Sequence, residues 1–136
     1  MIVADASILL KWFVEEEDRS HALELRQRHL EGRDIIAAPE LVFYEVANAF
    51  VCRTQLPPSE IEENLNQLLA YRLEVASWLE LLNVASIARK YSLTIYDASY
   101  AALAQALRCR LVTADERLLA RLKGMPHVHH LREVVQ

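Results

Sequence analysis

Short apolar segments alternate along this chain with longer segments in which apolar residues recur at helical spacing. The short segments predict β-strands and the longer ones predict α-helices, because a buried strand needs only about four to eight residues. Strands are expected near residues 1–5, 34–38, 72–76, 109–113 and 127–131. Helices are expected near residues 7–14, 19–31, 40–54, 59–70, 79–91, 96–107 and 115–122. Strands separated by helices favour a central parallel sheet of about five strands flanked by helices, so the predicted fold class is α/β.

Proline and short polar residues predict where some of these helices begin. Pro39 suits the first position of a helix, where its missing N–H costs no hydrogen bond. Ser59 with Glu62, and Ser77 with Glu80, have the spacing of a capping box, in which the two side chains satisfy free N–H groups of the first turn. These signals support the three helices that follow them.

The composition predicts a globular domain with a substantial core. The chain has 136 residues, of which 53% are hydrophobic, and it contains only two glycines. One domain spanning residues 1–136 is therefore expected, with about two-thirds of the unfolded chain's surface buried. The net charge of −4 excludes a protein that binds polyanions non-specifically over its whole surface. It leaves open a nucleic-acid site in which a local basic rim and a bound metal hold a phosphodiester.

The cysteines and the N-terminal segment predict a cytoplasmic protein. Cys52 and Cys109 lie in apolar segments without CxxC spacing, which is typical of a reduced protein. Asp5 and Lys11 interrupt the apolar N-terminal segment, which argues against a signal peptide. No uncharged apolar run reaches the length that a membrane-spanning helix needs, so no membrane partner is expected.

Four acidic residues lie in apolar sequence, where a carboxylate is costly. Asp5 and Asp115 each end an apolar strand segment, while Glu45 and Asp97 lie within apolar helices. Burying a carboxylate without a partner costs several kcal/mol or forces it to take up a proton. No lysine or arginine accompanies these acids at comparable spacing. A divalent cation from solution is therefore the expected partner, and hard cations such as Mg²⁺ or Mn²⁺ prefer carboxylate oxygens.

The predicted topology brings these acids to one place. The carboxyl ends of parallel strands lie at the same edge of a sheet, so Asp5 and Asp115 are expected to point into one crevice. Glu45 and Asp97 would project from helices above it. Carboxylates that converge in this way suit one or two divalent cations, which can acidify a water and neutralise a phosphodiester. Short polar residues beside the acids are candidates for orienting carboxylates or waters: Ser7, Asn48 and Thr113.

Helix capping is the alternative explanation for each of the aspartates. Asp5 and Asp115 each precede a predicted helix, and Asp97 stands three residues after Thr94, as in a capping box. Taken singly, each aspartate fits a cap as well as it fits a metal ligand. Glu45 does not, because it lies in the middle of a nearly all-apolar helix that is either central or covered by another subunit.

Three tyrosines and one lysine near the acids also have two interpretations. Tyr44, Tyr96 and Tyr100 could stack on bases, but core packing is the expectation for aromatic residues in apolar helices. Lys11 could contact a phosphate or the acids, and a solvated lysine is the alternative.

Four segments around the acids carry motifs in a recognisable order and spacing. They are Val3-Ala4-Asp5-Ala6-Ser7, Glu45-Val46-Ala47-Asn48, Tyr96-Asp97-Ala98-Ser99-Tyr100 and Val112-Thr113-Ala114-Asp115-Glu116-Arg117-Leu118. Together they resemble the PIN-domain nucleases and, more closely, the VapC toxins of prokaryotic type II toxin–antitoxin modules. The resemblance covers essentially the whole chain and implies a PIN fold with a central parallel sheet.

The same resemblance implies a Mg²⁺- or Mn²⁺-dependent endoribonuclease that hydrolyses RNA phosphodiester bonds. The family's catalytic and metal-binding acids match four residues of this chain: Asp5, Glu45, Asp97 and Asp115. Its polar neighbours match Ser7, Asn48 and Thr113. The family also implies a homodimer and a small VapB-like antitoxin, which inserts a segment, often with a basic residue, toward the acids.

In the expected mechanism, three aspartates bind the metal directly or through water, namely Asp5, Asp97 and Asp115. Glu45 ligates the metal or helps to deprotonate the attacking water. Two alternatives within the family stay open: a PIN nuclease that is not a toxin, and a PIN module that binds a partner without catalysis. A third alternative is a different metal-dependent phosphatase. Those of the haloacid-dehalogenase type need an Asp-x-Asp pair after the first strand, where this chain has Asp5-Ala6-Ser7.

Overall fold

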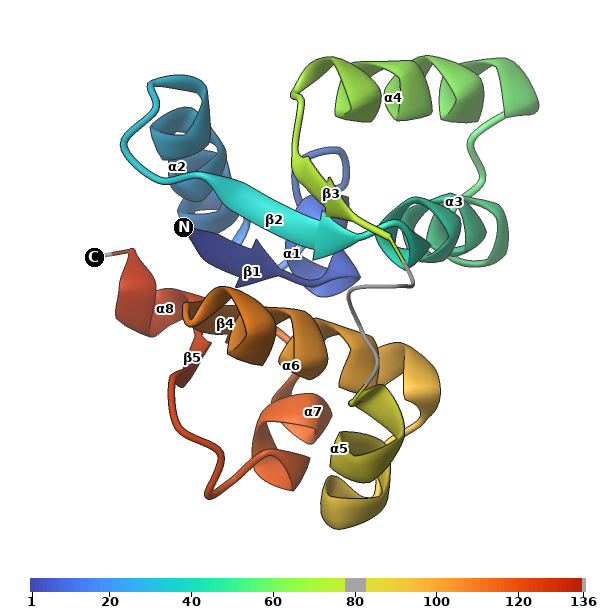
Figure 1. Cartoon of the computed structure of the whole chain (residues 1–136). Helices are drawn as coiled ribbons and strands as arrows, with labels where there is room; N and C mark the ends of the chain where they lie inside the picture. Colours follow the sequence, from blue (N-terminus) through green and yellow to red (C-terminus); the bar gives the residue numbers. More distant parts are fainter. Residues whose placement is uncertain (78–82, 136) are drawn as a thin grey trace.

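A computed structural model of the chain describes residues 1–77 and 83–135, which form a five-stranded sheet covered by helices (Figure 1). The strands are β1 (Ile2–Ala4), β2 (Ile36–Pro39), β3 (Glu74–Ala76), β4 (Arg110–Thr113) and β5 (Val128–His130). Their order across the sheet is β3-β2-β1-β4-β5, and every neighbouring pair is parallel. The predicted α/β class with a parallel sheet of about five strands is confirmed.

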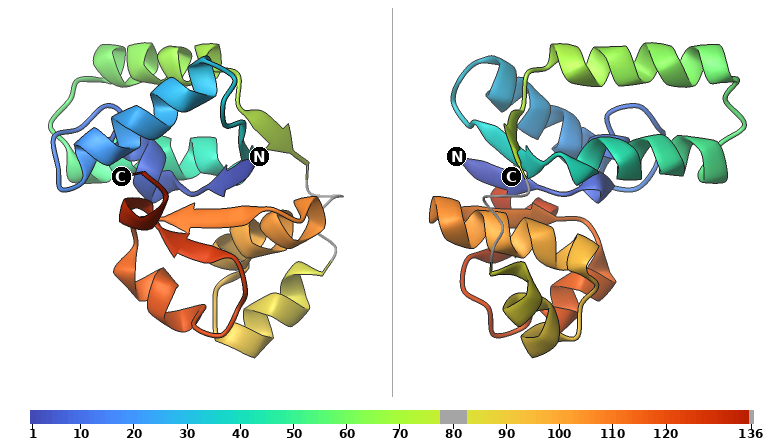
Figure 2. Two further views of the ribbon diagram at one scale, coloured as in Figure 1. Left: turned by 90° about the vertical axis from the view of Figure 1, so that its left-hand side faces the viewer. Right: turned by 45° about the vertical axis from the view of Figure 1, so that its right-hand side comes forward.

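The helices are α1 (Ala6–Leu10), α2 (Arg19–Leu30), α3 (Leu41–Arg53), α4 (Pro58–Ala70), α5 (Val84–Tyr91), α6 (Ile95–Leu107), α7 (Glu116–Arg121) and α8 (Leu131–Val134). α6 lies across the middle of the sheet, in contact with β1, β2 and β4. Figure 2 shows α4 at one end of the molecule and α5 and α7 at the other. In the described part of the chain, no helix is both long and apolar enough to cross a membrane.

The path of the chain changes direction at β1. From β1 the chain moves outward through β2 to β3, and it then returns to the other side of β1 to form β4 and β5. Ala4 at the end of β1 is in register with Val112 near the end of β4. The residues that follow these two strands therefore emerge side by side, at the kind of switch point where open α/β sheets bind ligands.

β1 and α6 form the centre of the core. All three residues of β1 are buried, as is the run of α6 from Ala98 to Ala104. Alanines dominate this run, and they combine high helix propensity with little bulk. Their small side chains let the helix backbone lie close to the three central strands.

α3 is central on one face and apolar but exposed on another. Its inner face consists of Val42, Val46 and Phe50, all fully buried. Tyr44 and Val51 lie on its outer side with 70% and 67% of their surface exposed. The nearly all-apolar character of this helix thus has two sources, a core face and an uncovered face.

Two of the predicted helix starts are wrong. Pro39 ends β2 instead of opening a helix, since it is in register with Ala76 of β3. The N–H of Glu40 donates to the Ala76 carbonyl of β3 at 3.2 Å, so position 39 faces the β1 side, where the register with β1 ends at Ala37 and no N–H is needed. Ser59 lies inside α4, which begins one residue earlier at Pro58.

The C-terminal region contains a helix that the sequence pattern did not predict. The strand expected near residues 127–131 ends at His130, and α8 follows at once. The ring Nδ1 of His130 accepts a hydrogen bond from the Arg132 N–H at 3.1 Å, so a histidine performs the capping role. Histidine is not among the usual capping residues, which is why this helix start was missed.

The helix expected near residues 79–91 is described only from Val84 onward. Residues 79–82 lie outside the described part of the chain, and so does Glu80 of the proposed capping box with Ser77.

Replacing Phe50 by alanine tests the assignment of the inner face of α3. The Phe50 ring is fully buried, with its centroid 5.6 Å from that of Phe13. Phe50→Ala should lower the free energy of unfolding by about 3–5 kcal/mol in urea denaturation. The matched control Val51→Ala, on the exposed side, should change it by about 0.5 kcal/mol or less. Equal losses for the two variants would contradict the assigned face.

Candidate active site

Asp5 lies at the joint between β1 and β4, where the two strands end. It is 5% exposed, and it caps α1 by accepting a hydrogen bond from the Ser7 N–H at 3.1 Å. Its Oδ1 also accepts from the Ser7 hydroxyl at 2.5 Å, and its Oδ2 accepts from the Thr113 hydroxyl. The carboxylate is thus held by three donors, two of them side-chain hydroxyls.

The two hydroxyls that hold Asp5 are themselves fixed by the backbone after β4. Ser7 Oγ accepts a hydrogen bond from the Ala114 N–H at 2.9 Å, and Thr113 Oγ1 accepts from the Asp115 N–H at 3.0 Å. Each hydroxyl can donate one bond and accept others, so the donor direction is set toward the carboxylate. Ser7 and Thr113 therefore lie where their predicted role in orienting Asp5 requires.

Burial dominates the electrostatics of Asp5. Removal from water raises the pKa of the Asp5 carboxyl to about 6, although the hydroxyls of Ser7 and Thr113 oppose this shift. The negative charges of Asp115 and Glu45 add to the rise. A carboxyl in such surroundings favours a proton or a cation at the site.

Glu45 projects from the middle of α3 and is half-buried. Its Oε1 accepts a hydrogen bond from the Tyr100 hydroxyl of α6 at 2.5 Å. Burial raises the pKa of Glu45, the Tyr100 hydrogen bond lowers it, and the charge of Asp97 raises it. No capping function accounts for this residue, as expected from its position within the helix.

Asp97 lies in the first turn of α6 and Asp115 precedes α7. Thr94, not Asp97, caps α6, because its Oγ1 accepts from the Asp97 N–H at 3.1 Å. Asp115 does cap its helix, accepting from the Arg117 and Leu118 N–H groups at 2.9 and 3.2 Å. Capping therefore explains part of the surroundings of all three aspartates: Asp5 and Asp115 are caps themselves, and Asp97 pairs with the cap Thr94 as expected for a capping box.

The four acids are electrostatic neighbours. Besides the effects on Asp5, burial raises the pKa of Asp97, the charge of Arg117 lowers it and that of Asp115 raises it. The charge of Asp97 in turn raises the pKa of Glu45. Every acid of the set therefore repels at least one other, and the fold has brought together residues that are up to 110 positions apart in the sequence.

Among the described residues, no basic side chain forms an ion pair with any of the four acids. Arg117 and Arg121 act on Asp97 only at longer range, and the Arg121 guanidinium donates instead to the Ser92 carbonyl at 2.7 Å. A set of carboxylate oxygens without a cation matches the donor chemistry that Mg²⁺ and Mn²⁺ prefer.

The side chains are not arranged as a finished metal cage. Within the described residues, no three His, Cys, Asp or Glu side chains lie close enough together to hold a metal ion. Two of the acids are engaged instead in the capping and hydroxyl contacts given above. Asp5 accepts three hydrogen bonds, whereas a carboxylate offers about four acceptor positions, so one remains free.

Two other residues near the acids lie differently from expectation. Asn48 is exposed on α3, and its Oδ1 accepts from Cys52 Sγ at 3.4 Å rather than contacting an acid. Lys11 is only 8% exposed and its Nζ lies 3.1 Å from Glu16 Oε1, so the solvated alternative is wrong. Lys11 is therefore paired with Glu16 and not with one of the four acids.

The three tyrosines divide into one core residue and two surface residues. Tyr100 is 1% exposed, so core packing is confirmed for it, and its contact with Glu45 is a feature that sequence reasoning missed. The signal for it is its position three residues after Asp97, which puts both on one side of a helix. Tyr44 and Tyr96 are 70% and 60% exposed, so the expectation of core packing is wrong for them.

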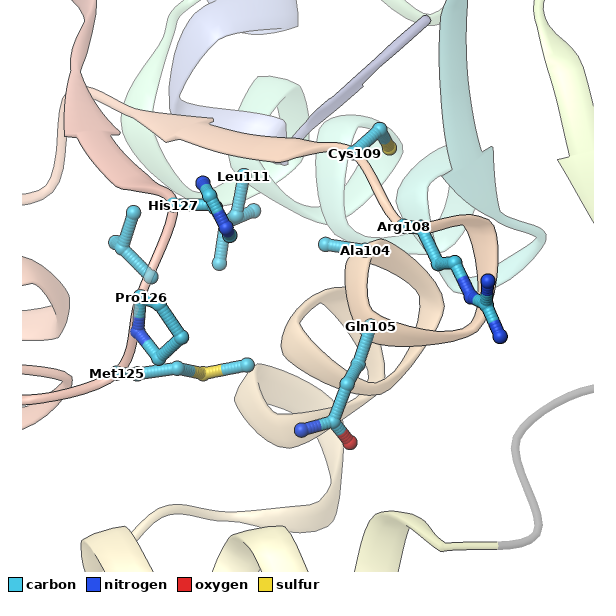
Figure 3. A pocket seen from close by; sticks show the side chains of 9 residues that line it. Ala104, Gln105, Arg108, Cys109, Leu111, Met125, Pro126 and His127 are labelled. Atoms are coloured by element: carbon cyan, nitrogen blue, oxygen red, sulfur yellow. The ribbon is translucent and has the colours of Figure 1, made fainter.

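Two of the hollows in the surface lie at opposite ends of α6. The first, of about 220 Å³, is shown in Figure 3 between the C-terminal end of α6, the start of β4 and the loop before β5. Cys109 and Leu111 line it, so it lies at the opposite end of β4 from Thr113. The second, of about 260 Å³, adjoins the N-terminal ends of α3 and α6, where Tyr44 and Tyr96 line it.

The comparisons with known proteins agree with this architecture. Residues 2–124 match the PIN domain family. Over 130 residues, the chain is 31% identical to Ribonuclease VapC3 of Pyrobaculum aerophilum, covering 91% of this chain and 96% of that protein. The chain therefore belongs to the PIN domain family.

Two solved structures have the same fold. The crystal structure of PAE2754 from Pyrobaculum aerophilum matches with a TM-score of 0.70 and 27% identity, covering 98% of this chain and 85% of that one. A toxin–antitoxin complex from Klebsiella pneumoniae contains a chain with a TM-score of 0.71, covering 96% of this chain and 98% of its own. At 19% identity, the second likeness is one of fold.

Asp5 should make the metal-free protein less stable as the pH rises. Its pKa is 3.8 ordinarily and about 6 in the folded protein, so the folded state binds the additional proton between these values. Stability should fall between about pH 4 and pH 6, by roughly 3 kcal/mol in total, and the effect should vanish at lower pH, where both states are protonated.

Urea denaturation in the presence of a chelator measures this effect. Asp5→Asn removes the titrating group but keeps the shape of the side chain. The stability of the variant relative to the natural protein should therefore increase from pH 4 to pH 6 and then level off. A difference between the two proteins that is independent of pH would contradict the assigned cause.

Proposed function

We propose that this chain is a metal-dependent endoribonuclease that hydrolyses RNA phosphodiester bonds and is the toxin of a VapBC-type toxin–antitoxin module. Membership of the PIN domain family and the similarity to a protein named Ribonuclease VapC3 support a nuclease. The observation that carries the proposal is a cluster of four acids, one of them buried, that has no ion-pair partner in the described chain. Residues 1–136 would act as one nuclease domain.

The proposed cofactor is Mg²⁺ or Mn²⁺, held by Asp5, Asp97 and Asp115 with Glu45. These acids supply the oxygen donors that such a cation prefers, and their mutual repulsion supplies the driving force for its binding. When bound, the cation neutralises charge on the scissile phosphodiester and lowers the pKa of a water.

Protein groups then orient and complete the site. Ser7 and Thr113 keep the Asp5 carboxylate in place through their hydroxyl donors. Glu45 is the proposed acceptor of a proton from the attacking water, because it is half-buried and its pKa is raised toward neutrality. Arg117 lies exposed at the start of α7, near enough to act on Asp97, and is placed to attract an RNA phosphate.

Replacing Asp97 by asparagine tests the assignment of the acids. Asp97→Asn removes a charge from a residue that does not cap its helix, so the fold should be kept. Cleavage of RNA in the presence of Mg²⁺ or Mn²⁺ should fall by about a thousandfold or more, measured with a fluorescently labelled oligonucleotide.

The matched control for this experiment is Glu63→Gln, an exposed acid on α4. It should cleave RNA at the rate of the natural protein, and a chelator should abolish cleavage by both. Undiminished cleavage by Asp97→Asn would refute the site. An absence of any metal-dependent cleavage by the natural protein would favour a non-catalytic PIN module.

We further propose a homodimer and a VapB-like antitoxin as partners, in the cytoplasm where the RNA substrate is found. Apolar residues exposed around the N-terminal ends of α3 and α6 support a self-contact there, especially Tyr44 and Tyr96 beside the 260 Å³ hollow. An antitoxin that brings a lysine or arginine to the four acids would supply the cation that they lack. The second copy would cover the exposed apolar residues, and the antitoxin would neutralise charge on the four acids.

Sedimentation velocity tests the proposed dimer. The natural protein should sediment as a particle of twice the 15.6 kDa of one chain. Tyr44→Glu with Tyr96→Glu should give a monomer, because two charges would be buried at the contact without partners. A monomeric natural protein, or a dimer that survives both changes, would contradict the proposed surface.

A further inference from the structure

Tyr100 joins the two helices that carry Glu45 and Asp97. Its ring is 1% exposed within α6, and its hydroxyl donates to Glu45 Oε1 of α3 at 2.5 Å. Both helices pack against β2, so this bond crosses between two elements that share a common support. A buried phenol hydroxyl needs an acceptor, and here the acceptor is one of the four acids.

Glu45 depends on this contact for its orientation. Among the described residues, the Tyr100 hydroxyl is the only hydrogen-bond partner of its carboxylate. A glutamate side chain has three rotatable bonds and, when half-exposed, adopts many conformations unless something holds it. The Tyr100 side chain has two rotatable bonds that place its ring, and burial fixes both. The position of the hydroxyl is therefore fixed, and its hydrogen bond fixes the Glu45 carboxylate.

The position of Tyr100 on its helix connects it to a second acid. It follows Asp97 by three residues, so the two side chains lie on the same side of α6. The charges of Glu45, Asp5 and Asp97 all act on its hydroxyl. The hydroxyl therefore lies among the acids, and its bond to Oε1 leaves Oε2 of Glu45 available.

We propose that Tyr100 is a positioning residue, which holds the Glu45 carboxylate in the orientation that the metal and the attacking water require. The inference deepens the proposed function and rests on it. Tyr100 does not itself touch the substrate; it acts through Glu45.

Tyr100→Phe tests this role because it removes the hydroxyl and keeps the buried ring. The affinity for Mn²⁺, measured by calorimetric titration, should fall about tenfold or more, as is typical when a group that orients a metal ligand is lost. kcat should fall by a similar factor, while KM for RNA should stay within about twofold. The matched control is Tyr91→Phe, at the end of α5, which should change none of these quantities.

A double-mutant cycle separates an effect through Glu45 from a general structural effect. In the Glu45→Ala background, Tyr100→Phe should cause no further loss of Mn²⁺ affinity, because the group on which it acts is gone. Losses that multiply in the double variant would overturn the proposal. Nuclear magnetic resonance of the natural protein gives a second test should Tyr100→Phe fail to fold. The Tyr100 hydroxyl proton should be protected from exchange, and a rapidly exchanging proton would overturn the proposal.

The titrations also separate this inference from the proposed function. Mn²⁺ binding by the natural protein together with unchanged affinity and kcat in Tyr100→Phe would overturn the role of Tyr100 alone. No saturable Mn²⁺ binding by the natural protein would overturn both. The proposal would be supported if Mn²⁺ binding weakens in Tyr100→Phe and is unchanged in Tyr91→Phe. Binding by the double variant should then be no weaker than binding by Glu45→Ala.

Discussion

The hydrogen bonds around the buried carboxylate of Asp5 are the interaction on which the site depends. The hydroxyls of Ser7 in α1 and of Thr113 at the end of β4 donate to it, and each accepts a hydrogen bond from an N–H of the backbone after β4. These bonds connect the turn after β1 with the turn after β4, so they place Asp115 beside Asp5. Parallel pairing of the two strands brings the turns together, and the hydroxyl network then fixes them.

Holding acids together in this way costs stability, and this cost is one reason for proposing that the region is functional. Burial and neighbouring charges raise the pKa values of Asp5, Glu45 and Asp97, and no contacting cation in the described chain offsets them. Proteins tolerate such conflicts between local electrostatics and folding mainly where activity requires them. A divalent cation, an RNA-bound metal or a basic residue of an antitoxin would each relieve the same repulsion. In the proposed function, the metal cofactor and a basic residue of the antitoxin would therefore neutralise the same acids.

Much of the sheet could be predicted from the sequence, because the apolar strands are short and clearly separated by helices. The ends of elements were less predictable, since they depend on tertiary contacts. Pro39 extends β2 because β3 lies beside it, and α8 begins because His130 caps it. The four acids stood out through their apolar neighbours. Tyr100 did not, because its role depends on a contact between residues 55 positions apart, and Asn48 looked closer to the site than it lies.

We propose that the four acids form one cluster that a divalent cation stabilises. Thermal unfolding of the chelator-treated protein at increasing Mn²⁺ concentration tests it most directly, because a ligand that binds only the folded state raises the unfolding temperature. The midpoint should rise with Mn²⁺ in the natural protein and should not rise in Asp5→Asn. A midpoint that is unaffected by Mn²⁺, or that rises equally in both proteins, would contradict the claim.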